Sequence, residues 1–479
     1  MVDRRFALLS LLACLGGAWL LYLPALQGQF VFDDIPLLVL NRCHEGLAGL
    51  AQAFDFGSGH TCSLRPVRFV SYALDHAVFG PGPFGFHATN HLLHGLVAWL
   101  AGALVARLTR QRWVGAVAGL LFLTHPIATE AVAYIAGRRD LLAALGGLGL
   151  AHVWLGARSA LRIGHFALLA LLYLLALGAH EAAVAAPAVL VAYEVFLGRL
   201  DRRRVITLGG LLALGGLFTV WTLTAHNFSR TSALWGGDLL THTTTVLHGH
   251  AHYLRQLAWP LALQADYSPA GFPIGDRVGG AVGAVLVAGA VALMIGLRRR
   301  KPLISFGLAA YGLLLLPTSQ IVPHHELLAE HRLYLASLVF CAFAAAAAHR
   351  LGRWGFVGPV VVVLAYIALT RVRIDDWRDE AALWTATLAV APETGRAHAN
   401  LGALRAEQGD HETARAHLLE AARLRPDLCE VHYNLGLLTQ DLDAFLRAWA
   451  CDPKPRWRAP IGERLRRAGR LEEATRLGL

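Results

Sequence analysis

Residues 87–126 read HATNHLLHGLVAWLAGALVARLTRQRWVGAVAGLLFLTHP, and this stretch decides the fold class. It holds two long apolar runs, near 87–107 and 113–126, with three arginines in the short turn between them. A helix needs about 20 mostly apolar residues to cross a bilayer, and arginines gather in turns that face the cytoplasm. The stretch therefore predicts two membrane-spanning helices joined by a cytoplasmic turn.

The same alternation of apolar runs and short basic turns extends over most of the 479 residues. The chain is 56% hydrophobic and 16% charged, whereas soluble domains carry about 25% charged residues. Eleven spans are expected, near 6–26, 87–107, 113–126, 139–157, 163–179, 182–198, 205–225, 278–297, 303–321, 332–349 and 354–371. The first is expected to be a retained helix, with a signal peptide as the alternative. The stretch 163–198 would also fit one re-entrant hairpin.

The distribution of positive charge predicts the topology. The net charge of +10 comes in short clusters between the apolar runs, which is typical of a membrane protein and not of a nucleic-acid-binding face. With a cytoplasmic N-terminus, the expected cytoplasmic arginines and lysine are Arg4, Arg5, Arg107, Arg110, Arg112, Arg158, Arg162, Arg199, Arg202, Arg203, Arg204, Arg298, Arg299, Arg300, Lys301, Arg350 and Arg353. An odd number of spans then places the C-terminal region outside the cytoplasm.

A repeat of 34 residues begins beyond the last apolar run. The matching pairs are Pro392 and Pro426, Asn400 and Asn434, Leu401 and Leu435, Gly402 and Gly436, and Ala414 and Ala448. This period is typical of tetratricopeptide repeats, in which each unit is a pair of helices. We expect a leading helix over 377–391 and a third, partial unit near 469–474. The predicted fold is therefore all-α, with a transmembrane domain at 1–371 and an extracytoplasmic repeat domain at 372–479.

Four of the six cysteines fall in two possible pairs. Cys43 and Cys62 lie in one loop, and Cys429 and Cys451 lie in the repeat region. In an oxidising compartment either pair could form a disulfide, and two free thiols fit each pair equally well.

Two adjacent carboxylates, Asp33 and Asp34, follow the first apolar run. Ionisable groups beside the hydrocarbon boundary indicate a functional site, and neighbouring like charges raise the pKa of one of them. That suits a general base or a ligand for a divalent metal. The alternative is a solvated start of a loop in which an aspartate caps a helix.

Further polar groups gather in the loops predicted on the same side. They are Arg65, Arg68, Asp75, His76, His87, Asn90, His91, His94, His125, Glu130, Arg138, Arg139, Asp140, His180, Glu181, Glu330, His331 and Arg332. His87, His91 and His94 share one helical face, so a zinc site is possible, but no H-E-x-x-H pattern is present and a polar stripe facing a wet cavity is favoured. Together these groups predict one outer cavity.

The ordered motifs resemble those of the transmembrane and tetratricopeptide-repeat protein O-mannosyltransferases and their bacterial relatives, which have the multispanning GT-C glycosyltransferase fold. The matching strings are FVFDD at 30–34, RPVRF at 65–69, FHATNH at 86–91, HPIATEAVAY at 125–134, GRRD at 137–140, DYS at 266–268 and EHRLYL at 330–335. Two positions depart from the family. His180-Glu181 stands where Lys-Glu is expected, and Ala336 replaces a usual proline.

The resemblance implies inverting transfer of a hexose, with mannose expected, from a polyprenyl-phosphate donor to an extracytoplasmic acceptor. The expected acceptor is a protein Ser or Thr, with a glycan as the alternative. Asp33 would be the catalytic base, and Asp34 would support it or hold the acceptor. The donor phosphate would be bound by Arg138, Arg332, Arg65 and His180. The cavity would be lined by His91, His125, Glu130, Glu181 and Glu330.

The remaining expectations concern cofactors, partners and location. No cofactor is certain, no metal ligand is assigned, and a divalent metal stays possible. The bilayer and protein partners of the repeats are expected, and nucleic acid is not. The expected location is a bacterial inner membrane, with the repeats on the periplasmic side. A non-enzymatic scaffold that recruits envelope-assembly factors is the alternative function. A transporter fits less well because the polar groups lie in outer loops and not at the bilayer midplane.

Overall fold

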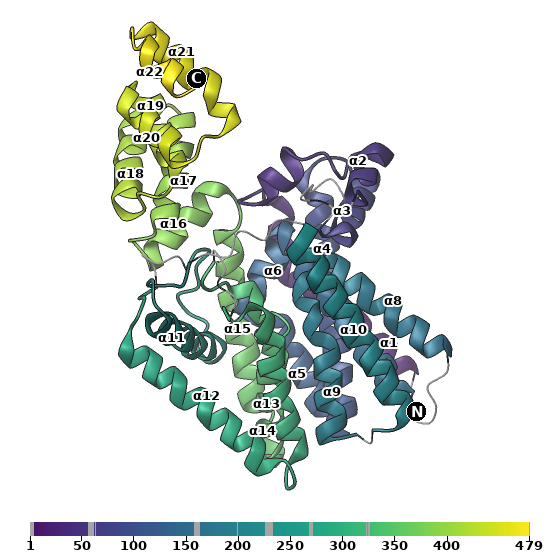
Figure 1. Cartoon of the computed structure of the whole chain (residues 1–479). Coiled ribbons are helices and arrows are strands. Elements are labelled where there is room, and N and C mark those ends of the chain that lie inside the picture. Colours follow the sequence, from purple (N-terminus) through teal and green to yellow (C-terminus); the bar gives the residue numbers. More distant parts are fainter. Residues whose placement is uncertain are drawn as a thin grey trace. The chain divides into compact units, whose positions relative to one another are not determined.

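The computed structural model describes residues 4–55, 62, 64–157, 163–198, 200–225, 233–267, 272–321, 323 and 326–478. All regular secondary structure in these ranges is helical, which confirms the all-α class (Figure 1). Four residues that carried an expectation, Arg158, Arg162, Arg199 and Ser268, lie outside the described residues.

The helices group into two units by their contacts. The first unit comprises Met1–Leu263 and Ile274–Asp379, and the second comprises Gln264–Pro273 and Glu380–Leu479. The α-helices of the first unit are α1 (Arg4–Tyr22), α2 (Gly46–Ala53), α3 (Pro66–Phe79), α4 (Pro83–Thr109), α5 (Arg112–Thr124), α6 (Thr129–Ala133), α7 (Arg138–Gly156), α8 (Ile163–Ala179), α9 (Ala186–Phe196), α10 (Arg202–Ala225), α11 (Leu239–Ala258), α12 (Arg277–Leu297), α13 (Pro302–Leu315), α14 (Ser337–His349) and α15 (Val357–Asp376).

Short helical turns connect them: η1 (Leu23–Gln27), η2 (Ile35–Val39), η3 (Pro126–Ala128), η4 (Ile135–Gly137), η5 (Glu181–Ala185), η6 (Leu316–Thr318), η7 (Glu330–Leu333) and η8 (Gly352–Trp354). Several of these turns carry the polar motifs. They interrupt the apolar runs where a helix would otherwise continue, and so bring charged side chains to the helix ends.

Five helices of the described residues are long and apolar enough to cross a membrane, and a bent pair gives a sixth if it counts as one span. The five are Arg5–Gln27, Pro83–Thr109, Arg202–Thr224, Arg277–Leu297 and Val357–Asp376, and the bent pair is Arg112–Thr124 with Pro126–Ala133. Each of the eleven predicted runs contains a helix, but several of these helices are short or interrupted. The first unit is thus built of membrane-type helices, and the count of eleven spans stays a prediction.

Helix α4 is the packing centre of the first unit, where it contacts α1, α5 and α7. Glycines make the closest of these contacts. A Cβ atom on Gly102 would lie 2.8 Å from the carbonyl oxygen of Gly115 in α5, and one on Gly95 would lie 2.9 Å from the carbonyl oxygen of Cys14 in α1. Helices in lipid associate through such small residues, because burial of apolar surface from water does not drive them together there.

The second unit stacks helix pairs, as the 34-residue period predicts (Figure 1). Its helices are α16 (Glu380–Val390), α17 (Gly395–Glu407), α18 (His411–Leu424), α19 (Cys429–Thr439), α20 (Leu442–Cys451), α21 (Pro455–Arg467) and α22 (Leu471–Arg476). A Cβ atom on Gly402 would lie 2.7 Å from Leu418, and one on Gly436 would lie 2.8 Å from Phe445. Glycine at this repeat position therefore lets the two helices of each pair approach closely.

The chain beyond the second pair forms a third pair, α21 and α22. Trp457, Ile461, Leu465 and Ala474 are buried there against Phe445 of α20. The hint of a third unit in the sequence thus has a structural counterpart. Helix α15 continues to Asp376, and the contact units divide after Asp379. The boundary predicted after residue 371, between the transmembrane domain and the repeat domain, stays a prediction.

Both candidate cysteine pairs are bonded. Cys43 is linked to Cys62, and Cys429 of α19 is linked to Cys451 of α20. The other two cysteines, Cys14 and Cys341, are free thiols within apolar helices.

Candidate active site

The segment after η1 carries the two adjacent carboxylates, and they have different environments. Asp34 is fully buried. Its Oδ1 accepts the backbone N–H of Ala136 at 2.7 Å and its Oδ2 accepts that of Val31 at 3.2 Å, so Asp34 ties this segment to turn η4. Burial raises the pKa of Asp34 to about 8, against the lowering effect of these donors, and the charge of Asp33 adds to the rise.

Asp33 is partly exposed, and no hydrogen bond or ion pair of its carboxylate is present among the described residues. Its backbone N–H donates to the Tyr134 hydroxyl at 3.2 Å. The preceding residue, Phe32, has φ of 51°, a conformation that a bulky residue seldom adopts. Such strain collects at functional sites. Asp33 is therefore an available base on a segment held in place by its neighbour.

Tyr134 connects this segment to the end of α15. Its ring stacks on Trp377 with centroids 5.1 Å apart, and the guanidinium of Arg373 lies over the same indole at 5.7 Å. Arg373 pairs with the fully buried Glu330 at 3.3 Å and with Asp376 at 2.9 Å. Glu330, which was expected to line a cavity, is instead half of a buried ion pair.

Arg138, the first residue of α7, is fully buried and holds three helices together. It pairs with Asp75 of α3 at 2.5 Å, and donates to Asn90 Oδ1 of α4 at 2.8 Å, to the Phe86 carbonyl at 2.7 Å and to Ser71 at 3.3 Å. These contacts occupy the guanidinium of Arg138. Its environment is that of a residue that stabilises the fold, and the side chain is not open to a phosphate.

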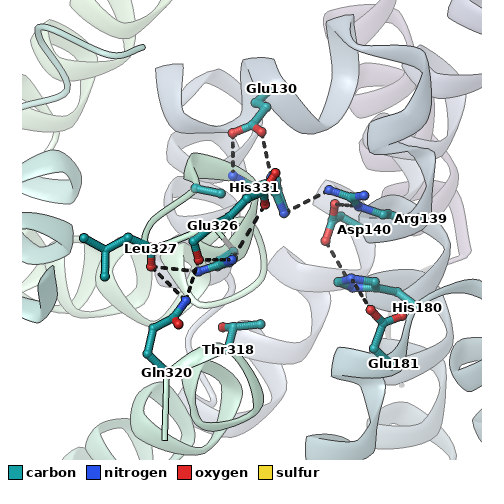
Figure 2. A network of polar contacts seen from close by, with 12 residues as sticks. Glu130, Arg139, Asp140, His180, Glu181, Thr318, Gln320, Glu326, Leu327 and His331 are labelled. Carbon is teal, nitrogen blue, oxygen red and sulfur yellow. Dashed lines mark hydrogen bonds and ion pairs between the residues drawn. The ribbon is translucent and has the colours of Figure 1, made fainter. Parts of the chain in front are cut away.

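The next residue, Arg139, faces a polar network that Figure 2 shows at close range. Its Nη2 donates to His331 Nε2 at 3.0 Å. On the other side, His331 Nδ1 lies 2.7 Å from Glu130, which also accepts the His331 backbone N–H at 2.8 Å. Because arginine can only donate, Nε2 must be the accepting nitrogen and Nδ1 carries the proton. His331 is thus a neutral imidazole held between Glu130 and Arg139.

A second arm of the network runs from α7 to α3. Asp140 lies 3.4 Å from His180, and His180 lies 3.8 Å from Glu181. Glu181 in turn accepts two hydrogen bonds from Arg65, at 2.9 and 2.6 Å. Burial lowers the pKa of His180 to about 4, so its imidazole is neutral at pH 7. Burial would raise the pKa of Glu181, but the Arg65 charge outweighs it and holds that pKa well below the ordinary value.

Arg68, three residues after Arg65, is a buried cation with spare donors. Its side chain is 2% exposed, and its Nε and Nη1 have no hydrogen-bond partner among the residues that the structure describes. The pKa of Arg68 is lowered to about 10, mainly by burial and in smaller part by the charges of Arg65 and Arg139. Within the described ranges Arg139 Nε also lacks a hydrogen-bond partner, although it pairs with Asp140 at 3.5 Å. Arg68 and Arg139 therefore offer unused donors to an anion.

A small pocket of about 70 Å³, called the polar pocket here for the charged side chains in its lining, lies beside the network. Asp140, His180, His331 and Arg332 contribute its charged and polar lining. Arg332 donates hydrogen bonds to the carbonyl oxygens of Leu327 and Glu326, both at 3.0 Å. These bonds fix the orientation of its guanidinium. Of the predicted phosphate ligands, His180 and Arg332 reach this pocket, and Arg65 approaches it through Glu181.

A larger apolar groove of about 580 Å³ adjoins the polar pocket. It runs between α4, α7, α9, α13 and α14, and four residues line both cavities: Gly147, Ala186, Leu314 and Leu335. Lys301 and Arg350 line its other end, at the opposite termini of α13 and α14. Since α13 has 14 residues, the groove follows about 20 Å of helix.

Two predicted cavity residues, His91 and His125, lie in helix-packing contacts. His91 is fully buried between the rings of Trp19 and Tyr22, at centroid distances of 6.0 and 5.7 Å. His125 Nδ1 accepts the Ile127 N–H at 3.2 Å, so it caps η3. No group of three His, Cys, Asp or Glu side chains placed to hold a metal ion occurs among the described residues.

Comparison with known proteins finds one family model and several similar proteins. A model of the tetratricopeptide repeat matches residues 402–443. The protein O-mannosyl-transferase Tmtc2 of Drosophila melanogaster is 30% identical over 295 residues, which are 55% of this chain and 31% of that protein. The protein O-mannosyl-transferase F38B6.6 of Caenorhabditis elegans is 27% identical over 85% of this chain and 61% of its own length.

The protein O-mannosyl-transferase TMTC4 of Mus musculus is 26% identical over 81% of this chain and 63% of its own length. The chain thus spans less than two thirds of the length of each of these relatives. No solved structure matches the chain. Sequence similarity therefore covers most of the chain, including both the membrane-type helices and the repeats.

Proposed function

We propose that this chain, which is homologous to the transmembrane and tetratricopeptide-repeat protein O-mannosyltransferases over much of its length, is itself a membrane glycosyltransferase. It transfers a hexose, with mannose the expected sugar, from a polyprenyl-phosphate donor to Ser or Thr of a protein. Transfer takes place on the extracytoplasmic side and inverts the anomeric centre, as in GT-C enzymes.

The observation that carries the proposal is the apolar groove that leads into a polar pocket. A polyprenyl phosphate has a long hydrocarbon tail and a charged head, and each part matches one of the two cavities. The shared lining at Gly147 and Leu335 would let one molecule occupy both. A scaffold that only recruits partners would need neither cavity.

The donor phosphate is assigned to Arg332, which lines the pocket, and to Arg139, which donates to the pocket residue His331, with Arg68 and Arg65 as further cations. Phosphate is bound well by arginine forks in sites screened from water. Spare donors on Arg68 and Arg139 support this assignment. It moves the donor site from Arg138 to Arg139, because the contacts of Arg138 are already made within the protein.

The reaction is a single displacement. Asp33 takes the proton of the acceptor hydroxyl while the acceptor oxygen forms a bond to the anomeric carbon. The bond from that carbon to the phosphate oxygen breaks, and the electron pair leaves with polyprenyl phosphate. The departing phosphate needs stabilisation of charge, which Arg139 and Arg332 supply. Asp34 holds the segment so that the Asp33 carboxylate stays free.

The side of the membrane on which the active site and the repeats lie is proposed from the disulfides and from the positively charged turns. Disulfides persist in oxidising compartments. One disulfide is in the segment that carries Asp33, and the other is in the repeats. These bonds support an extracytoplasmic active site and repeat domain, as do the basic turns at the opposite helix ends. We place the protein in a bacterial inner membrane with the repeats in the periplasm.

The test is transfer of labelled mannose from polyprenyl phosphate to a Ser/Thr-rich peptide by the purified full chain. Asp33→Asn should lower the rate by about 10²–10⁴-fold while donor binding persists, because a general base contributes about that much. Glu45→Gln, at a partly exposed carboxylate in the same region, is the matched control and should keep full activity. An Asp33→Asn variant that transfers sugar at the unmodified rate would refute the assigned base, and a silent unmodified protein would favour a scaffold.

A further inference from the structure

His331 lines the polar pocket, and no step of the proposed transfer uses it. In Figure 2 its side chain lies between the Glu130 carboxylate and the Arg139 guanidinium. We propose that His331 is the proton donor of the transfer reaction. It takes up a proton when the donor phosphate binds and delivers that proton to the departing polyprenyl phosphate. The inference rests on the proposed transferase function and adds a second catalytic group to Asp33.

The need for a proton follows from the charge of the phosphate. A sugar donor linked to a lipid through one phosphate is a phosphodiester and carries a single negative charge. Loss of the sugar leaves a phosphomonoester, whose second ionisation has a pKa of about 6, so it would depart with two charges at neutral pH. A pocket of about 70 Å³ has little room for water around the second charge, so a proton delivered there favours departure.

Glu130 enables the His331 ring to hold a positive charge. The Oε1 atom of Glu130 accepts a hydrogen bond from Nδ1 at 2.7 Å, and its Oε2 accepts the backbone N–H of His331 at 2.8 Å. Both oxygens act as acceptors, as in an ionised carboxylate. A protonated ring would then face Glu130 through Nδ1 and a phosphate through Nε2. Negative charge on both sides favours the protonated form.

Arg139 couples this protonation to donor binding. Its Nη2 donates to His331 Nε2 at 3.0 Å, which keeps that nitrogen unprotonated while the pocket holds no donor. When Nη2 turns to the donor phosphate, Nε2 loses its hydrogen bond, and a buried acceptor without a partner is unfavourable. A proton taken up at Nε2 removes this cost, because Nε2 then donates to the phosphate.

The transfer step balances with Asp33 and His331 acting together. The acceptor oxygen bonds to the anomeric carbon while its proton passes to Asp33. The bond from that carbon to the phosphate oxygen breaks, the electron pair stays on the phosphate, and His331 Nε2 gives the phosphate its proton. Polyprenyl phosphate leaves with one charge and His331 returns to its neutral form. Asp33, which is partly exposed, then releases its proton to water.

The other groups around His331 are less suited to this role. Besides Glu130 they are Arg139 and Asp140 of α7, His180 of η5 and Arg332 of η7, whereas η3, which packs against η7, has no titratable side chain. Arginine gives up no proton at neutral pH. His180 is the other imidazole of the pocket, but its nearest carboxylate, Asp140, lies 3.4 Å away, against 2.7 Å between His331 and Glu130.

Proton uptake is measured by titration calorimetry of donor binding, without acceptor, in two buffers that differ in their heat of ionisation. The full chain in detergent is titrated with a short-chain polyprenyl-phosphate mannose. The unmodified protein should take up about one proton for each donor bound, and His331→Gln should take up none. His152→Gln changes a partly buried histidine of α7 that lines neither cavity, and it should match the unmodified chain.

The pH dependence of kcat is a readout that a merely structural role would not change. In the unmodified chain kcat should fall at high pH, where His331 no longer holds its proton. His331→Gln should lack this alkaline limb, with kcat lowered about 10²-fold at neutral pH, while the acid limb assigned to Asp33 remains. Glu130→Gln keeps the ring but removes the charge behind it, so the alkaline limb should move to lower pH.

The inference is wrong if the unmodified chain binds donor without taking up a proton, or if uptake and the alkaline limb persist in a folded His331→Gln. Loss of both in His180→Gln alone would assign the proton to that imidazole instead. Thermal unfolding establishes that the variants are folded. If His331→Gln does not fold, the unmodified proton count and the shifted limb of Glu130→Gln decide. Transfer without any of these effects contradicts only this inference, whereas a chain that neither binds donor nor transfers sugar contradicts the proposed function as well.

Discussion

Arg138 and Arg139 are adjacent in sequence, and we expect their substitution by alanine to produce opposite phenotypes. Arg138→Ala removes the partner of the buried Asp75 and leaves that carboxylate uncompensated. Breaking a buried ion pair in this way costs about 3–5 kcal/mol. Because whole proteins are stable by only about 5–15 kcal/mol, this variant should unfold readily in detergent.

Arg139→Ala should leave the fold largely intact. Arg139 makes one hydrogen bond to a neutral imidazole and a 3.5 Å ion pair with the buried Asp140, a longer contact than the Arg138–Asp75 pair, so its loss should cost less than that of Arg138, about 1–3 kcal/mol. If Arg139 stabilises the leaving phosphate, transfer should fall by about 10²–10³-fold, as for removal of one oriented donor to a developing charge. Arg139→Lys keeps the charge but loses the planar fork, and should be intermediate.

The assay pairs a thermal-unfolding curve with the rate of transfer and the donor affinity, for all variants in one detergent. We expect Arg138→Ala to lose stability first, and Arg139→Ala to lose donor affinity and rate at nearly unmodified stability. The reverse pattern would refute the reasoning. In that case a stable Arg138→Ala that no longer binds donor would restore Arg138 as the phosphate ligand.

Three further predictions follow from burial, volume and topology. Since the pKa of Asp34 is about 8 in the folded protein, against about 3.9 in an unfolded chain, stability should fall as pH rises from about 4 to 8, and Asp34→Asn should flatten this dependence of the melting temperature. Gly147→Phe should fill the junction of groove and pocket and raise the KM for long-chain donors more than for short-chain analogues; equal effects would argue against a tail in the groove. A reporter enzyme active only in the cytoplasm should be silent when fused after Leu479, and its activity there would contradict the extracytoplasmic repeats.

Much of the fold could be predicted because it depends on patterns that recur along short stretches of the sequence. Long apolar runs required helices, and the recurrence of Gly402 and Gly436 required close helix pairs. The number of spans could not be predicted in the same way. Residues 163–198 have enough apolar length for two spans, yet they form α8, the turn η5 and the short α9. The hydropathy of a segment indicates whether it is surrounded by lipid or by water. It does not indicate where a turn interrupts the helix.

The site was predictable in composition but not in detail. Charged motifs in loops drew attention to residues 138–140, but adjacent positions on a helix point about 100° apart. Only the tertiary structure shows that Arg138 turns toward Asp75 and Arg139 toward His331. The unpartnered donors of Arg68 could not be predicted for the same reason, because sequence does not reveal which buried guanidinium lacks partners among the described residues.

The adjacent carboxylates show how burial separates two chemically identical groups. Asp34 accepts two backbone N–H groups and is closed off from water, so it fixes the geometry of its segment and resists ionisation near neutral pH. A neutral neighbour does not repel the charge of Asp33, whose carboxylate makes no hydrogen bond to the part of the chain that the structure describes. If both were exposed, their mutual repulsion would shift each pKa and let the segment move. Burying one of the pair therefore gives the other a defined position and a carboxylate that is free to take a proton.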